Sequence, residues 1–382
     1  MSPTRRLTTS AAALALLTAT GCVSDGPGGP NLVIMANVTD RVAMSTVITA
    51  FRESHPNIRV KVTYADTGVL QKELPRQLKA GKGPDVFTVW PGSGNPASAE
   101  TLANNNLLQD LTLHRYAWDL PEDVMSVAGS GGHIDIVPAS YSAIGAIYAI
   151  GALKSIGGRP PTTFTQVLDL CDRARKHGKV LFALGNKTPW VTQLVSYSLA
   201  AGTVYATQPN FASDMALHHT SFAQSPWREA LQKYLQMAEL RSAAPGISLS
   251  MHALPASDDP AQTRMPAAVS AAYGLNVHPA HEKEAKAFVD FLASARGQNL
   301  YNSKGTTLPA IPDGTFKSDP AVAEVARRQK DETTVPFMDQ RWPNSTVQQV
   351  HFQQIHDLFA GTTSVPSALK AMDRAFSDST LN

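Results

Sequence analysis

The apolar positions of residues 32–90 predict three strands separated by two helices. Short runs of strand-forming residues occur at Leu32–Ala36, Ile58–Tyr64 and Asp85–Trp90. Between them, Arg41–Ser54 and Val69–Ala80 carry apolar residues at helical spacing, and we expect Asp40 to cap the first helix. Parallel neighbours need such a crossover, so this order predicts a parallel sheet, whose ligands bind beyond the carboxyl ends of the strands.

The rest of the chain continues the alternation of strands and helices, which predicts an α/β fold. Four further apolar runs predict strands: Ile134–Pro138, Ala143–Ile150, Val180–Leu184 and Ala271–Val277. Between the first two, Ala139–Ser142 has the pattern of an exposed linker. Trp118 and Trp227 are expected to be packing residues.

The first 22 residues predict an exported protein. Arg5 and Arg6 precede a short apolar segment, Ala11–Leu17, which is too short to span a bilayer. Residues 17–22 read L-T-A-T-G-C and resemble a bacterial lipobox. We therefore expect a signal peptide at residues 1–21, a lipid on Cys22 and a tether over residues 22–30, which would anchor the protein to the outer face of the cytoplasmic membrane. Ordinary secretory cleavage is the alternative.

Composition narrows the classes of partner. The 382 residues are 43% hydrophobic and 17% charged, which suffices for two lobes with their own cores. Without Arg5 and Arg6, 31 basic residues balance 31 acidic ones. A neutral chain argues against nucleic acid or an anionic membrane as a partner. Cys171, the second of two cysteines, lies on the apolar side of a helical pattern and is expected in the core.

Motifs of enzymes and metal sites are missing from the sequence. There is no G-x-S-x-G nucleophile elbow, and Gly81–Pro84 lacks the Gly-Lys-Ser/Thr of a phosphate loop. The 11 histidines do not form an H-E-x-x-H motif. We therefore expect no catalysis, no metal and no cofactor.

Several segments, in this order along the chain, resemble bacterial extracellular solute-binding proteins of the carbohydrate-importer type. They are Ile48–Val62, Gly81–Phe87, Leu107–Leu111, Tyr148–Leu170, Glu284–Leu292 and Leu308–Pro309. Ala149 and Phe164 stand where the family usually has Asn and Trp. A family segment with a Gly-x-x-Ala-Met motif is not found between Ala243 and Met265.

The resemblance implies a periplasmic-binding-protein-like fold of type II. In this fold two lobes, each a mainly parallel sheet flanked by helices, are joined by a hinge and close on a ligand. We expect residues 31–139 and 269–309 in the first lobe, and residues 140–268 and 310–382 in the second. The implied partners are a small carbohydrate and the permease subunits of an ABC transporter, and the protein is expected to be a monomer.

Carbohydrates offer apolar faces to aromatic rings and hydroxyl groups to Asp, Asn and Arg. Such side chains at predicted strand ends and crossovers are Asn37, Asp66, Trp90, Tyr141, Trp190, Tyr273, Arg341 and Trp342. Trp90 and Trp190 are the favoured ligand contacts. For Asn37 and Asp66, helix capping or turn formation is the alternative.

The sequence therefore predicts a sugar-capturing lipoprotein of an ABC importer. Two alternatives stay open. One is a surface lipoprotein of the same fold with a degenerate cleft, acting in signalling or adhesion. The other is a secreted glycan hydrolase.

Overall fold

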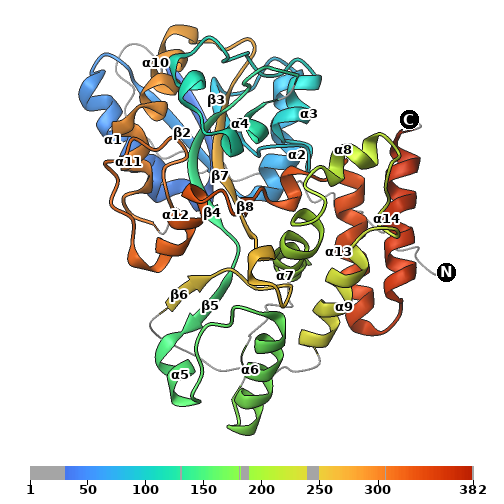
Figure 1. Cartoon of the computed structure of the whole chain (residues 1–382). Coiled ribbons are helices and arrows are strands. Elements are labelled where there is room, and N and C mark those ends of the chain that lie inside the picture. Colours follow the sequence, from blue (N-terminus) through green and yellow to red (C-terminus); the bar gives the residue numbers. More distant parts are fainter. Residues whose placement is uncertain are drawn as a thin grey trace, which may run out of the picture.

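The computed structural model describes residues 31–129, 131–179, 181, 189–238, 249–305 and 307–380. These residues form two lobes with separate hydrophobic cores (Figure 1). The expectations for residues 1–30, the signal peptide, Cys22 and the tether, lie outside the described residues.

The first lobe is built on a six-stranded mixed sheet. Its order is β2-β1-β3-β7-β4, with β8 paired to β7. The three predicted strands are confirmed as the parallel part: β1 (Leu32–Asn37), β2 (Val60–Ala65) and β3 (Val86–Val89). The long β7 (Met265–Leu275) runs antiparallel to both β3 and β4 (Val137–Ala143), and parallel to β8 (Thr334–Val335).

Helices pack on this sheet through apolar stripes at helical spacing. In α1, for example, Val47, Ile48 and Phe51 are buried, as their spacing predicts. Pro75 lies within α2, which continues beyond it to Lys79. The helices of this lobe are α1 (Arg41–Ser54), α2 (Thr67–Lys79), α3 (Ala99–Asn104), α4 (Glu122–Ala128), α10 (Glu282–Ala293), α11 (Ala295–Asn302) and α12 (Ala323–Lys330). Short 3-10 helices occur at η1 (Val38–Asp40), η2 (Arg115–Asp119) and η5 (Pro320–Val322).

Asp85, in the Gly81–Phe87 motif, holds the centre of the first lobe together. It is 2% exposed, and its carboxylate accepts hydrogen bonds from the backbone N–H of Val33 in β1 at 2.8 Å and of His281 at 3.1 Å. The His281 Nδ1 lies 2.9 Å from the same carboxylate. The motif residue therefore joins β1, the start of β3 and the start of α10.

The second lobe is mainly helical in its described part. Its helices are α5 (Ile150–Ser155), α6 (Phe164–Lys176), α7 (Pro189–Ala200), α8 (Phe211–Ala216), α9 (Trp227–Ala238), α13 (Ser345–Ala360) and α14 (Val365–Thr380). A π-helical turn, η3 (Ala201–Tyr205), extends α7, and 3-10 helices occur at η4 (Pro260–Gln262) and η6 (Met338–Gln340). Buried Cys171 and Trp227 belong to its core, as expected.

The expectation of a mainly parallel sheet is not met in the described residues of this lobe. They contain the antiparallel pair β5 (Ala146–Ala149) and β6 (Leu249–His252). The strand predicted at Val180–Leu184 lies outside the described residues except for Leu181. After β6, the chain passes through residues 253–264 and enters β7.

Three crossovers join the lobes: β4 to β5, β6 to β7, and β8 to η6. The boundary expected at residue 310 is wrong, because Ala310, Ile311, Val322 and Val325 pack in the first core. The chain enters the second core only at Met338. The linker expected at Ala139–Ser142 is also wrong, since these residues continue β4.

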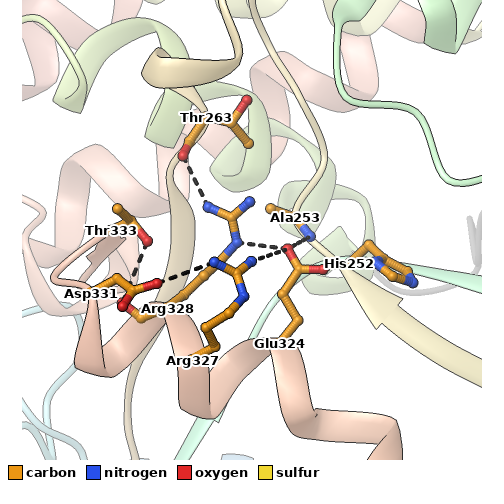
Figure 2. Close-up of polar contacts among 8 residues, drawn as sticks. All are labelled: His252, Ala253, Thr263, Glu324, Arg327, Arg328, Asp331 and Thr333. Carbon is orange, nitrogen blue, oxygen red and sulfur yellow. Dashed lines mark hydrogen bonds and ion pairs between the residues drawn. The ribbon is translucent and has the colours of Figure 1, made fainter.

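An ion-pair cluster fastens the second crossover to the first lobe (Figure 2). Glu324 on α12 lies 2.6 Å from the His252 Nδ1 at the end of β6 and 2.6 Å from the Arg328 Nε. Arg328 also donates to the Thr263 carbonyl oxygen at 3.0 Å. Burial raises the pKa of Glu324, but hydrogen bonds from Arg328 and the Ala253 N–H outweigh it and lower that pKa overall. The cluster therefore keeps Glu324 charged and joins the second crossover to α12 through ion pairs and hydrogen bonds.

Candidate functional site

The carboxyl ends of β1, β2 and β3 meet at the edge of the first lobe that the sequence predicts for ligand binding. Four side chains that are at least partly exposed lie at this edge, and we call them the strand-end patch: Asp40, Asp66, Trp90 and Ser270. Asp66 follows β2, is exposed, and makes no side-chain cap bond to α2. Its carboxylate is therefore available to a ligand.

Asn37, at the end of β1, has the capping role that was the alternative. It is 5% exposed, its side-chain oxygen accepts from the Thr39 N–H at 3.0 Å, and its amide donates to the Thr67 hydroxyl at 2.9 Å. Its backbone N–H donates to Thr88 on β3. Asn37 thus fixes the three strand ends relative to one another.

Asp40 is a candidate ligand contact that the sequence analysis assigned only to helix capping. Its carboxylate makes no cap bond and instead accepts from the Tyr273 hydroxyl at 3.0 Å. Burial raises the pKa of Asp40, while hydrogen bonds from Tyr273 and Thr39 oppose that rise. A partly buried carboxylate held in one orientation suits a hydrogen bond from a ligand hydroxyl.

Ser270 interrupts an otherwise buried strand. Every other residue of β7 is buried, whereas Ser270 is exposed. The β4–β7 pairing shifts register on both sides of Ser140, and the Ser270 hydroxyl lies 2.8 Å from the Ser140 hydroxyl. Such bulges redirect side chains. A single polar residue within the apolar sequence Ala267–Leu275 was the signal that could have predicted this opening.

Trp90 lies at the end of β3, as its position in the sequence predicts, and is half-buried. The loop that follows it packs directly on the second lobe. A β-carbon on Gly92 would lie 2.2 Å from the Gln340 carbonyl oxygen, and Ser93 donates to the Trp342 carbonyl oxygen at 2.6 Å. The strand-end patch therefore lies beside an interface between the two lobes.

Three predicted ligand contacts are interior residues in this structure. Tyr141 is 0% exposed, and its hydroxyl donates to Asp123 at 2.8 Å and to the Ala267 carbonyl oxygen at 3.0 Å. Burial raises the pKa of Tyr141, and the nearby Asp123 charge raises it further. Tyr141 lies in β4, not in an exposed linker, and so packs the hinge.

Tyr273 and Trp342 are the other two. Tyr273 is 0% exposed, and its hydroxyl donates to the Asp40 carboxylate. The same hydroxyl lies 3.1 Å from that of Tyr301. Trp342 is 3% exposed in the second core, where its Nε1–H donates to the Tyr197 hydroxyl at 3.0 Å. These two aromatic rings offer no open face to a ligand in this structure.

Arg341 lines a separate groove of about 840 Å³ between the lobes. Tyr205 comes to this groove from the second lobe, Asp123 from α4, and Thr334 from β8. Burial lowers the pKa of Arg341. The walls of the groove come from both lobes, so the groove is next to the hinge. None of its lining residues belongs to the strand-end patch.

Trp190 lies at the start of α7, where the sequence predicts it. Its side chain lies outside what the structure describes.

Within the described ranges, no group of three or more His, Cys, Asp or Glu residues could hold a metal ion. In the same part of the chain, every helix is too short or too polar to cross a membrane.

An α/β chain of two lobes joined by three crossovers has the type II periplasmic-binding-protein fold. The model of the bacterial extracellular solute-binding protein family matches residues 36–299, and the chain belongs to this family. No curated protein sequence matches the chain.

Solved structures share the fold over nearly their whole length. A family 1 extracellular solute-binding protein from Bifidobacterium longum subsp. infantis superposes with a TM-score of 0.72 at 17% identity, covering 92% of this chain and 100% of that one. A protein described in connection with xylan utilization by Caldanaerobius polysaccharolyticus gives 0.75 at 17% identity, covering 90% and 99%. A sugar transporter from Bacillus licheniformis, in complex with stachyose, gives 0.70 at 15% identity, covering 91% and 99%.

Proposed function

We propose that this protein captures a sugar or oligosaccharide between its lobes and delivers it to the permease of an ABC importer. A lipid on Cys22 would hold it at the outer face of the cytoplasmic membrane. The observation that carries the proposal is the strand-end patch. Its one indole and three polar side chains are at least partly exposed, beside the contact of Ser93 with the second lobe. The descriptions of similar proteins, which name stachyose and xylan utilization, support a carbohydrate ligand.

The patch has the chemistry that a neutral sugar needs. The Trp90 indole provides an apolar face for the C–H groups of a sugar ring. The carboxylates of Asp40 and Asp66 accept hydrogen bonds from vicinal hydroxyls, and the Ser270 hydroxyl can donate or accept. We place Trp190 on the opposite lobe as the second aromatic contact.

Function then follows from differential binding. A ligand that contacts both lobes only in the closed form shifts the open–closed equilibrium towards that form. No covalent step is involved. The three crossovers are where the backbone would rotate, and the groove near Arg341 would change its volume as the lobes move.

A thermal-shift screen tests the proposal. Raffinose, stachyose, xylo-oligosaccharides and chitin oligosaccharides are suitable probes, and a bound sugar should raise the melting temperature because it stabilises only the folded form. For the sugar found, Trp90→Ala should weaken binding by roughly 1–3 kcal/mol, about 5- to 150-fold in Kd, because the stacking surface is lost.

Leu217→Ala is the matched control for isothermal titration, because Leu217 lies outside the strand-end patch and is exposed. Its Kd for the same sugar should equal that of the wild type. An unchanged Kd in Trp90→Ala would remove Trp90 from the site. Chromatographic detection of sugar cleavage would show a hydrolase and overturn the transport function.

A further inference from the structure

The segment around η2 exposes two large apolar side chains on the first lobe. Leu113 is 88% exposed and Trp118 is 74% exposed. The sequence analysis expected Trp118 to be a packing residue, and the structure shows that this is wrong. A tryptophan with most of its indole in water gains little from burial in the fold, so its ring face is open to a ligand.

A groove of about 950 Å³ runs beside this segment. Leu113, Tyr116 and Asp119 line it, and Trp118 is the residue before Asp119 in η2, next to the lining rather than part of it. The other walls come from α10, the start of α11 and residues 311–313, so the groove lies wholly on the first lobe. It shares no residue with the strand-end patch, and Figure 1 shows α10 on the side of the first lobe away from α9 and α13.

Charged side chains of both signs line the groove. They are Arg115, Asp119, Lys286, Asp290 and Asp313. The Asp290 carboxylate is oriented by the His114 Nδ1 at 2.7 Å. The backbone N–H and hydroxyl of Thr315 donate to Asp313, which lowers the pKa of that carboxyl group. Among the described residues, the side chains of Arg115 and Asp119 have no hydrogen-bond or ion-pair partner.

This combination selects a class of ligand. Because cationic and anionic groups are mixed along the groove, it has no single-sign field that would favour an ion. Carboxylates and a guanidinium group form paired hydrogen bonds with neighbouring hydroxyls, and an exposed indole stacks on apolar ring faces. An open groove of this size takes several units of a chain. A neutral polysaccharide has all of these features.

We propose that the groove and Trp118 form a second carbohydrate site, which holds a neutral polysaccharide chain on the outer surface of the first lobe. The site is independent of lobe closure and would keep the protein close to polymer from which short sugars are released. Trp118 provides the stacking face, and Arg115 and Asp119 bind hydroxyls on either side of it.

Native affinity gel electrophoresis measures this binding directly. The purified protein is run in gels containing xylan, galactomannan, dextran, amylopectin or mixed-linkage β-glucan. The wild type should be retarded in one or more of these gels. Trp118→Ala should lose at least about half of the retardation, since the ring that stacks on the sugar face is removed. Trp118→Phe should keep most of it, because the aromatic face remains.

Trp90→Ala serves as the matched control, because it removes an indole from the strand-end patch alone. It should be retarded like the wild type, while Trp118→Ala keeps the wild-type affinity for the short sugar. Failure of one proposal is therefore distinguishable from failure of the other. No retardation of the wild type in any gel, or equal retardation of Trp118→Ala and wild type, would overturn the second site.

Two further measurements separate other occupants of this surface. Sedimentation with phosphatidylcholine–phosphatidylglycerol vesicles tests a lipid surface, and analytical ultracentrifugation tests a second copy of the chain. Vesicle binding or dimerisation that depends on Trp118, without retardation by any polysaccharide, would also overturn the proposal.

Discussion

The two lobes stabilise themselves in different ways. The first lobe surrounds a six-stranded mixed sheet, in which the Asp85 carboxylate accepts a hydrogen bond from β1 and Asn37 donates to Thr88 and Thr67, which aligns the strands. The second lobe, in its described part, packs helices around a buried aromatic cluster: Tyr197, Phe222, Trp227, Trp342 and His351. A sheet brings several strand ends to one edge, so the first lobe can present a polar patch.

The aromatic cluster explains where Trp342 is placed. Its ring centroid lies 5.5 Å from that of Trp227 and 5.0 Å from that of His351. Gln340, two residues earlier, donates to the Val269 carbonyl oxygen of β7 at 2.6 Å. The third crossover is therefore attached to one lobe by a hydrogen bond and to the other by aromatic packing.

The largest expected effect comes from Trp342→Ala, which removes the centre of the second lobe's core. It should lower the free energy of unfolding by about 4 kcal/mol, because a buried indole is lost and a cavity remains. Urea denaturation gives the total loss, and hydrogen exchange should locate it in α7, α9 and α13. Equal loss of protection in β1 and β3 would contradict separate cores. Trp118→Ala, in an exposed position, should change stability by less than about 0.5 kcal/mol.

Asp85→Ala tests the first lobe in the same way. It should cost about 3 kcal/mol, because the N–H groups of Val33 and His281 lose a buried acceptor. Hydrogen exchange should now increase in β1 and at the start of α10, the reverse of the Trp342→Ala result. Asp66→Ala is the control, since that exposed carboxylate makes no cap bond. A loss of less than 1 kcal/mol in Asp85→Ala would show that packing alone aligns the strands.

The smallest effect is a pH dependence of the second lobe. Burial lowers the pKa of His351 from 6.5 to about 3. Below pH 6.5 the unfolded chain binds a proton that the folded chain does not, so stability is complete above that pH and falls as the solution becomes acidic. The slope from this group is about 1.4 kcal/mol per pH unit between pH 6 and pH 4.

His351→Gln removes that titration, so its free energy of unfolding should depend less on pH over this interval than that of the wild type. Urea denaturation at each pH unit measures the difference. The same replacement at His177, an exposed residue, is the control and should leave the slope unchanged. Parallel curves for wild type and His351→Gln would mean that His351 is protonated in the folded protein.

Prediction from sequence succeeded where local patterns decide structure. The strands β1, β2 and β3 and helix α1 follow from apolar spacing, and Trp90 falls at a strand end because Gly and Pro stop the chain there. The prediction that Tyr141 and Trp342 are open ligand contacts was wrong. An aromatic residue near a crossover can either face a ligand or pack in the interior, and its sequence position does not distinguish the two. Only packing against α4 or against Trp227 selects the interior.

The sequence by itself determined the alternation of elements, the family motifs and the balance of charge, because these depend on residues close together in the chain. Tertiary structure decided which polar groups reach solvent: Asp40 points to Tyr273, 233 residues away, and Ser270 is exposed through bulges between β4 and β7. It also decided that Trp118 is exposed while Trp227 is buried. Exposure depends on what distant segments cover, and no local pattern records that.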